Sequence, residues 1–109
     1  MTSTIMNPIH KQTLTTGAEL VSFGNLVILN LEDWSPSNAI TIPSEYRPTA
    51  KAIGGGHRTN NGVYVSICRF EIDTTGVLSG YVAGAYNTGN GWSNAINTDK
   101  LTGVVIWTK

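Results

Sequence analysis

Few side chains in this sequence are of the types that catalyse reactions or bind metals. The chain has two histidines, His10 and His57, and one cysteine, Cys68. The histidines lie in unrelated segments and match no zinc-ligand spacing, and no segment has the oxygen-ligand spacing of a calcium loop. We therefore expect neither a metal nor another cofactor, and we expect Cys68, inside an apolar segment, to be a small buried hydrophobic residue.

Acidic residues are paired at Glu32/Asp33 and at Glu71/Asp73. A glycosidase needs two carboxyl groups that face each other across a cleft, about 5–10 Å apart. Neighbours along a strand point to opposite faces, so Glu32 and Asp33 do not face each other, while Glu71 and Asp73 flank a turn. A serine triad built on His57 would lack a nucleophile elbow. The residue types therefore predict that the chain is not an enzyme.

Binding of a saccharide fits the sequence better than catalysis. Proteins hold sugars with aromatic rings, which stack on the C–H faces of the sugar, and with planar polar groups, which bind adjacent hydroxyls. Five aromatic side chains are candidate platforms: Trp34, Tyr64, Tyr81, Trp92 and Trp107. Trp92 lies in the Gly/Asn/Ser-rich segment 87–97, which predicts an exposed ring on a polar loop. For Tyr64 and Trp107 we favour packing in the core or an interface, and Trp34 fits either role.

Composition narrows the class of protein that positions these groups. A chain of 109 residues allows one domain and one modest core. Basic and acidic residues number seven each, so the formal net charge is zero and no basic stripe indicates a nucleic-acid partner. No apolar run reaches the length of a membrane span, and the N-terminal residues show no signal-peptide pattern.

Alternating and β-branched apolar residues predict an all-β fold. The apolar run 26–31 follows a Gly24-Asn25 turn and should pair with residues 19–23. Residues 62–73 alternate, with Phe70 and Ile72 on the core face. Helical spacing of apolar residues is absent. We expect seven to nine short strands in an antiparallel jelly-roll-like sandwich or related barrel.

Several segments carry more specific predictions. A short strand is expected at 39–42, before Pro43. The glycine triplet 54–56 predicts a bulge or bend where a strand twists or another backbone approaches closely, because no helix follows that would make it a phosphate loop. His57 and Arg58 should then lie on a polar loop that ends in a type I′ turn at Asn61-Gly62.

Four segments follow one another along the chain: Gly-Asn-Leu-Val-Ile-Leu, Ile-Pro-Ser-Glu-Tyr-Arg-Pro, Ile-Asp-Thr-Thr-Gly-Val and the last strand, 102–109. Their order and spacing resemble the C-terminal ends of bacteriophage tail-fibre and baseplate proteins, especially the receptor-binding heads of lactococcal phages. The resemblance covers residues 19–109 and implies a head domain there, after an arm or linker at 1–18. It also implies a homotrimer on the virion that meets other tail proteins and binds host cell-surface saccharide outside the cell.

The same resemblance implies a binding site. In lactococcal phage heads, a His and an Asp two residues apart precede a hairpin and hold the glycan, assisted by an aromatic residue on the next strand. Those positions fall here on Arg69, Glu71 and Tyr81, with both polar residue types changed. Trp92 or His57 would close the pocket. The alternative is that Arg69 and Glu71 form an ion pair, across strands or between subunits.

An apolar second face on one strand predicts self-association. Val63, Val65 and Ile67 alternate with residues that face the core. A neighbouring subunit is a natural cover, so we expect this face or the last strand near a three-fold axis. Two other functions remain open: a non-catalytic carbohydrate-binding module of another extracellular protein, which is usually a monomer, and a purely structural baseplate or tail domain.

Overall fold

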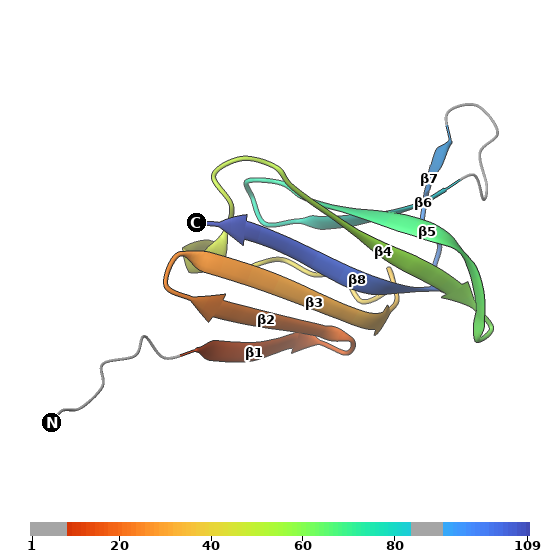
Figure 1. Cartoon of the computed structure of the whole chain (residues 1–109), viewed down its shortest axis with the longest axis horizontal. Coiled ribbons are helices and arrows are strands. Elements are labelled where there is room, and N and C mark those ends of the chain that lie inside the picture. Colours follow the sequence, from red (N-terminus) through yellow and green to blue (C-terminus); the bar gives the residue numbers. More distant parts are fainter. Residues whose placement is uncertain (1–8, 84–90) are drawn as a thin grey trace, which may run out of the picture.

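A computed structural model describes residues 9–83 and 91–109 (Figure 1). They form eight strands and one short 3-10 helix: β1 His10–Thr15, β2 Ala18–Phe23, β3 Leu26–Trp34, η1 Ser44–Tyr46, β4 Ala52–Asn60, β5 Val63–Ile72, β6 Leu78–Ala83, β7 Trp92–Asn94 and β8 Asp99–Thr108. All strand pairs are antiparallel. The all-β prediction is confirmed, and the finer jelly-roll arrangement stays a prediction.

The strands form one sheet in the order β1-β2-β3-β8-β4-β5-β6-β7. Two runs of neighbouring strands, β1 to β3 and β4 to β7, are therefore joined by β8, which pairs with β3 on one side and β4 on the other. Residues 10–15 of the predicted N-terminal arm form β1, at the edge of the sheet. Residues 1–8 of that arm lie outside the described part.

The connection between β3 and β4 covers the inner face of the sheet. The side chains of Ile40 and Ile42, which belong to this connection, are buried in the core. The predicted strand 39–42 is wrong in extent, since only Thr41 makes a bridge, to Val77. Pro43 lacks a backbone donor and ends the pairing at that point.

The core consists of the alternate residues that point inward from the sheet. Phe70, Leu29 and Ile72 are fully buried within it. Trp34 and Trp107 are also buried, at 2% and 7% exposure, and each indole N–H donates to a backbone carbonyl, of Asn38 at 2.8 Å and of Tyr46 at 2.7 Å. Neither ring can therefore serve as a saccharide platform.

The glycine triplet forms no bulge, which was one of the predicted alternatives. Residues 54–56 lie inside β4, and the register shift falls later, between Arg58 and Thr59. A Cβ on Gly56 would overlap the carbonyl oxygen of Thr102 on β8, so the predicted close approach of another backbone is confirmed. His57 and Arg58 lie within β4 and not on a polar loop, because β8 and β5 pair with β4 on both sides.

The hairpin after β4 follows its sequence signal. Asn61 and Gly62 both have positive φ, 52° and 79°, as a type I′ turn requires. Beyond this turn, Val63, Val65 and Ile67 are exposed on the outer face, and Tyr64 is exposed as well. The strand thus presents uncovered apolar side chains, as the prediction of a second apolar face required.

Candidate functional site

A hollow opens on the outer face of the sheet, over β5, β6 and β7. It has a volume of about 390 Å³ and is lined by Arg69, Glu71, Tyr81 and Trp92. Arg69 lies directly opposite Tyr81 on β6, because the turn after β5 fixes that register. The structure therefore brings together four of the five residues predicted for the site.

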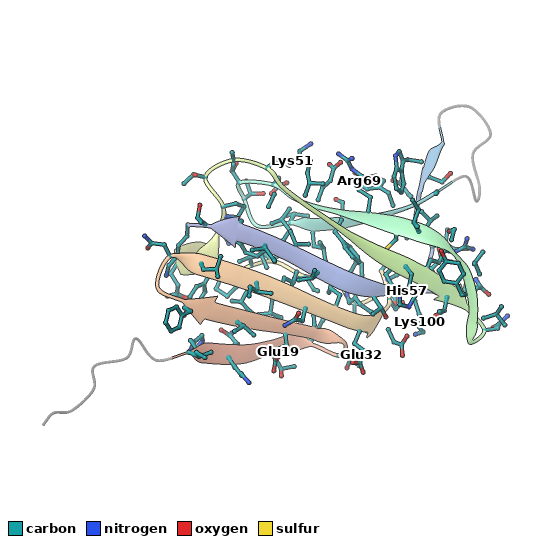
Figure 2. The ribbon with its side chains drawn as sticks, viewed as in Figure 1. Glu19, Glu32, Lys51, His57, Arg69 and Lys100 are labelled. Carbon is teal, nitrogen blue, oxygen red and sulfur yellow. The ribbon has the colours of Figure 1, made fainter. Side chains whose placement is uncertain are left out.

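The carboxylate of Glu71 is held by two cations. Arg69 Nε donates to Glu71 Oε2 at 2.9 Å, and Lys51 Nζ lies 3.1 Å from Oε1. The hydrogen bond from Lys51, followed by that from Arg69, lowers the pKa of Glu71 below its usual value. Lys51 and Arg69 lie on the same side of the molecule in Figure 2. The predicted ion pair thus exists, and it lies along one strand and not across strands.

The aromatic side of the hollow comes from β6 and β7. Tyr81 and Trp92 are each half-buried. Trp92 was predicted on a polar loop over residues 87–97, but it begins strand β7, paired with Ala83. The neighbouring Ser93 faces inward and is buried, so the alternation of the strand turns the Trp92 ring outward. Residues 87–90 of the predicted loop lie outside the described part.

His57 lies apart from this hollow. Its side chain is exposed on β4, opposite Ile67, and its ring centroid is 6.0 Å from that of Tyr64. The prediction that His57 closes the pocket is not met within one subunit. The strand pairing explains why, since His57 lies two residues beyond Gly55, the residue that faces Arg69.

A second hollow, which the sequence did not indicate, lies over β2 and β3 and the turn before them. Its volume is about 260 Å³. The residues that line it are Thr13, Gly17, Ala18, Glu19, Asn30 and Glu32. Glu19 and Asn30 face each other across β2 and β3, so they meet only once the sheet has formed. Their types alone, scattered among many polar residues, gave no signal.

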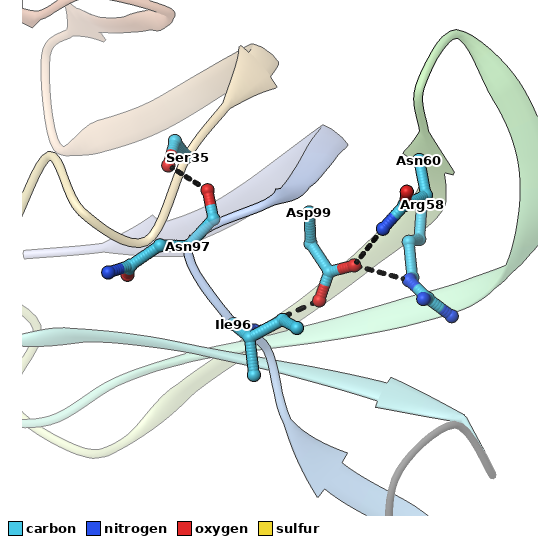
Figure 3. A network of polar contacts seen from close by, with 6 residues as sticks. All are labelled: Ser35, Arg58, Asn60, Ile96, Asn97 and Asp99. Carbon is cyan, nitrogen blue, oxygen red and sulfur yellow. Dashed lines mark hydrogen bonds and ion pairs between the residues drawn. The ribbon is translucent and has the colours of Figure 1, made fainter.

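A buried polar network holds the segment between β7 and β8 (Figure 3). Arg58 Nε donates to Asp99 Oδ1 at 2.7 Å, and Ile96 N donates to Asp99 Oδ2 at 2.9 Å. Ser35 Oγ donates to the carbonyl of Asn97 at 3.0 Å. Because this segment directly follows the strand that carries Trp92, the network supports one wall of the first hollow.

Comparison of the chain with protein-family models, with curated proteins and with solved structures gave no match. No helix in the described residues is long and apolar enough to cross a membrane. Over residues 9–83 and 91–109, His, Cys, Asp and Glu side chains form no group of three that could hold a metal ion.

Proposed function

We propose that this chain is a saccharide-binding domain and that the hollow at Arg69 is its binding site. The observation that carries the proposal is the combination of groups around one open depression. A guanidinium and a carboxylate lie side by side, at 2.9 Å, and two aromatic rings line the same hollow. Saccharides present both vicinal hydroxyls and apolar C–H faces, which these two kinds of group complement.

The polar pair is fixed before a ligand arrives. Both carboxylate oxygens of Glu71 already accept from a cation, and each keeps a further lone pair for a hydroxyl donor. Arg69 uses Nε in the ion pair, and its terminal nitrogens have no hydrogen bond to any described residue. Arg69 can therefore donate to one hydroxyl while Glu71 accepts from its neighbour, and little side-chain entropy is lost on binding.

The resemblance to phage tail proteins supplies the biological setting of this proposal. In that setting the domain is the receptor-binding head of a tail fibre or baseplate, trimeric, and it attaches the virion to saccharide on the host surface. A carbohydrate-binding module of another extracellular protein would use the same hollow and would be a monomer. A purely structural tail domain would leave the hollow without a ligand.

Substitution of the polar pair tests the proposal. The probe is an array of bacterial cell-wall and surface polysaccharides, followed by titration with the polysaccharide that binds. Glu71→Ala and Arg69→Ala should each weaken binding by about tenfold or more, because a hydrogen bond to a charged group contributes on the order of 1.5–3 kcal/mol. Glu45→Ala, which removes an exposed carboxylate on η1, is the control and should bind normally.

Three results would contradict the proposal. Wild-type affinity in both variants would place any saccharide elsewhere. Loss of the oligomer in both variants would make Arg69 and Glu71 an interface ion pair. A wild-type protein that binds nothing on the array would favour the structural alternative.

A further inference from the structure

One continuous row of cross-strand neighbours connects the two hollows. The row takes one residue from each strand: Thr13, Glu19, Asn30, Val104, Gly55, Arg69, Tyr81 and Asn94. Residues that face each other in neighbouring strands lie on the same face of a sheet. The whole row therefore runs over the outer face, perpendicular to the strands, with one hollow near each end.

The row carries polar side chains in both hollows, and between the hollows it holds only a glycine and one apolar residue. Thr13, Glu19 and Asn30 line the second hollow, and Arg69 and Tyr81 line the first. Between the hollows, Gly55 presents no side chain. Only Val104, which is partly exposed, stands in the row at that point. A ligand can therefore pass from one hollow to the other over a short apolar stretch.

We infer that the second hollow is a further subsite for the same saccharide chain, and that one linear polysaccharide lies along this row. The inference rests on the proposed function of the first hollow. Glu19 and Arg69 are separated by four strand spacings of about 4.8 Å, or roughly 19 Å. A chain of several sugar units covers that distance, whereas a single sugar fills one hollow only.

The second hollow also restricts the chemistry of the sugar that it takes. Unlike Glu71, the carboxylates of Glu19 and Glu32 form no ion pair with any residue that the structure describes. They accept hydrogen bonds from hydroxyl or ammonium groups and repel anions, while the Asn30 amide both donates and accepts. The sugar in this subsite is therefore neutral or carries an amino group.

Dependence on chain length tests this inference. The probes are the polysaccharide that binds on the array and short oligosaccharides prepared from it by partial hydrolysis, too short to span roughly 19 Å. Glu19→Ala/Asn30→Ala should weaken binding of the polysaccharide by about tenfold or more, through the lost hydrogen bonds. Binding of the short oligosaccharides should not change. Asn25→Ala/Glu45→Ala removes the same two residue types from exposed positions outside the row and serves as the control.

Each other result overturns the inference. Unchanged affinity for the polysaccharide in Glu19→Ala/Asn30→Ala would leave one binding site only. An equal loss for polymer and short oligosaccharides would show that the double variant perturbs the first hollow or the fold. The proposed function is judged separately, by the effect of Glu71→Ala on the short oligosaccharides, so the two ideas can fail independently. A wild-type protein that binds neither probe would overturn both.

Discussion

Arg58 Nε and Asp99 Oδ1 lie 2.7 Å apart, with the two side chains 7% and 0% exposed. Arg58 belongs to β4, and Asp99 is the first residue of β8. The carboxylate also accepts from Asn60 Nδ2 at 3.4 Å and from Ile96 N at 2.9 Å. One buried carboxylate thus connects the central strand pair to the segment after β7 (Figure 3).

Removal of one partner of this pair should destabilise the fold strongly. Asp99→Ala leaves the Arg58 charge buried without its carboxylate, and such changes cost about 3–5 kcal/mol. Arg58→Met/Asp99→Leu removes both charges and should recover most of that loss in urea denaturation. In both variants Ile96 N lacks its acceptor, which weakens the support of the segment after Trp92, so saccharide affinity should fall below that of the wild type in both. Equal stability of Asp99→Ala and wild type would contradict the role assigned to the pair.

Neighbouring glycines of β4 should differ sharply in their tolerance of a methyl group. A Cβ on Gly56 overlaps the Thr102 carbonyl and the Gly103 backbone, which no side-chain rotation relieves. Gly56→Ala should therefore lower the free energy of unfolding by about 1–3 kcal/mol or more. On Gly55 the nearest atom is the Cys68 carbonyl oxygen at 3.3 Å, so Gly55→Ala should stay within about 1 kcal/mol of wild type. Similar denaturation midpoints for the two variants would refute this difference.

The resemblance to phage receptor-binding heads predicted Arg69, Glu71 and Tyr81, the part of the candidate site that depends on neighbouring strands. The turn at residues 74–76 lies in the segment Ile-Asp-Thr-Thr-Gly-Val, which the same resemblance matches to a hairpin, and it sets the register that brings Arg69 opposite Tyr81. The sequence did not indicate the contact of Lys51 with Glu71, because the two residues meet only when β4 pairs with β5. The second hollow was missed for a similar reason, since it forms only when β1, β2 and β3 are assembled.

Pairings between distant segments were the part that the sequence could not reveal. Arg58 looked like a loop residue because its partner, Asp99, lies 41 residues away. No pattern in the chain indicated that β8 is inserted between β3 and β4. Strand existence is encoded by alternation along a few residues, whereas strand order depends on the total packing of the core.

Binding should persist at acidic pH. The cations at Lys51 and Arg69 lower the pKa of Glu71 from its ordinary value of 4.5. Because the pKa of Glu71 is lower in the folded than in the unfolded protein, the ionised carboxylate stabilises the fold fully at pH values above the unfolded-state pKa. This stabilisation is lost as the pH falls through the folded-state pKa. Saccharide affinity should follow the same curve, with its acid midpoint below 4.5. Glu71→Gln should flatten this pH dependence. An acid midpoint of saccharide affinity at or above 4.5 in the wild type would contradict the prediction.

Self-association should depend on the apolar face of β5. Light scattering should give a trimer for the wild type, and Val65→Lys should dissociate it, because an unpaired charge would be buried in the interface. Val77→Lys is a matched control, since Val65 and Val77 are both 45% exposed and Val77 lies outside β5. A stable monomer at micromolar concentration would end the trimer proposal, as would equal effects of the two lysines.

The central position of β8 in the sheet also determines when the domain can fold during its synthesis. On a ribosome, β1 to β3 and β4 to β7 are synthesised before the strand that joins them. Until β8 emerges, β3 and β4 each present an unpaired edge, which invites pairing with another chain. Completion of the sheet then needs contacts between residues as far apart in sequence as Leu26 and Thr108. Such long-range contacts make folding slow. Nascent chains of this domain are therefore most prone to aggregation after β4 has been synthesised and before β8 emerges.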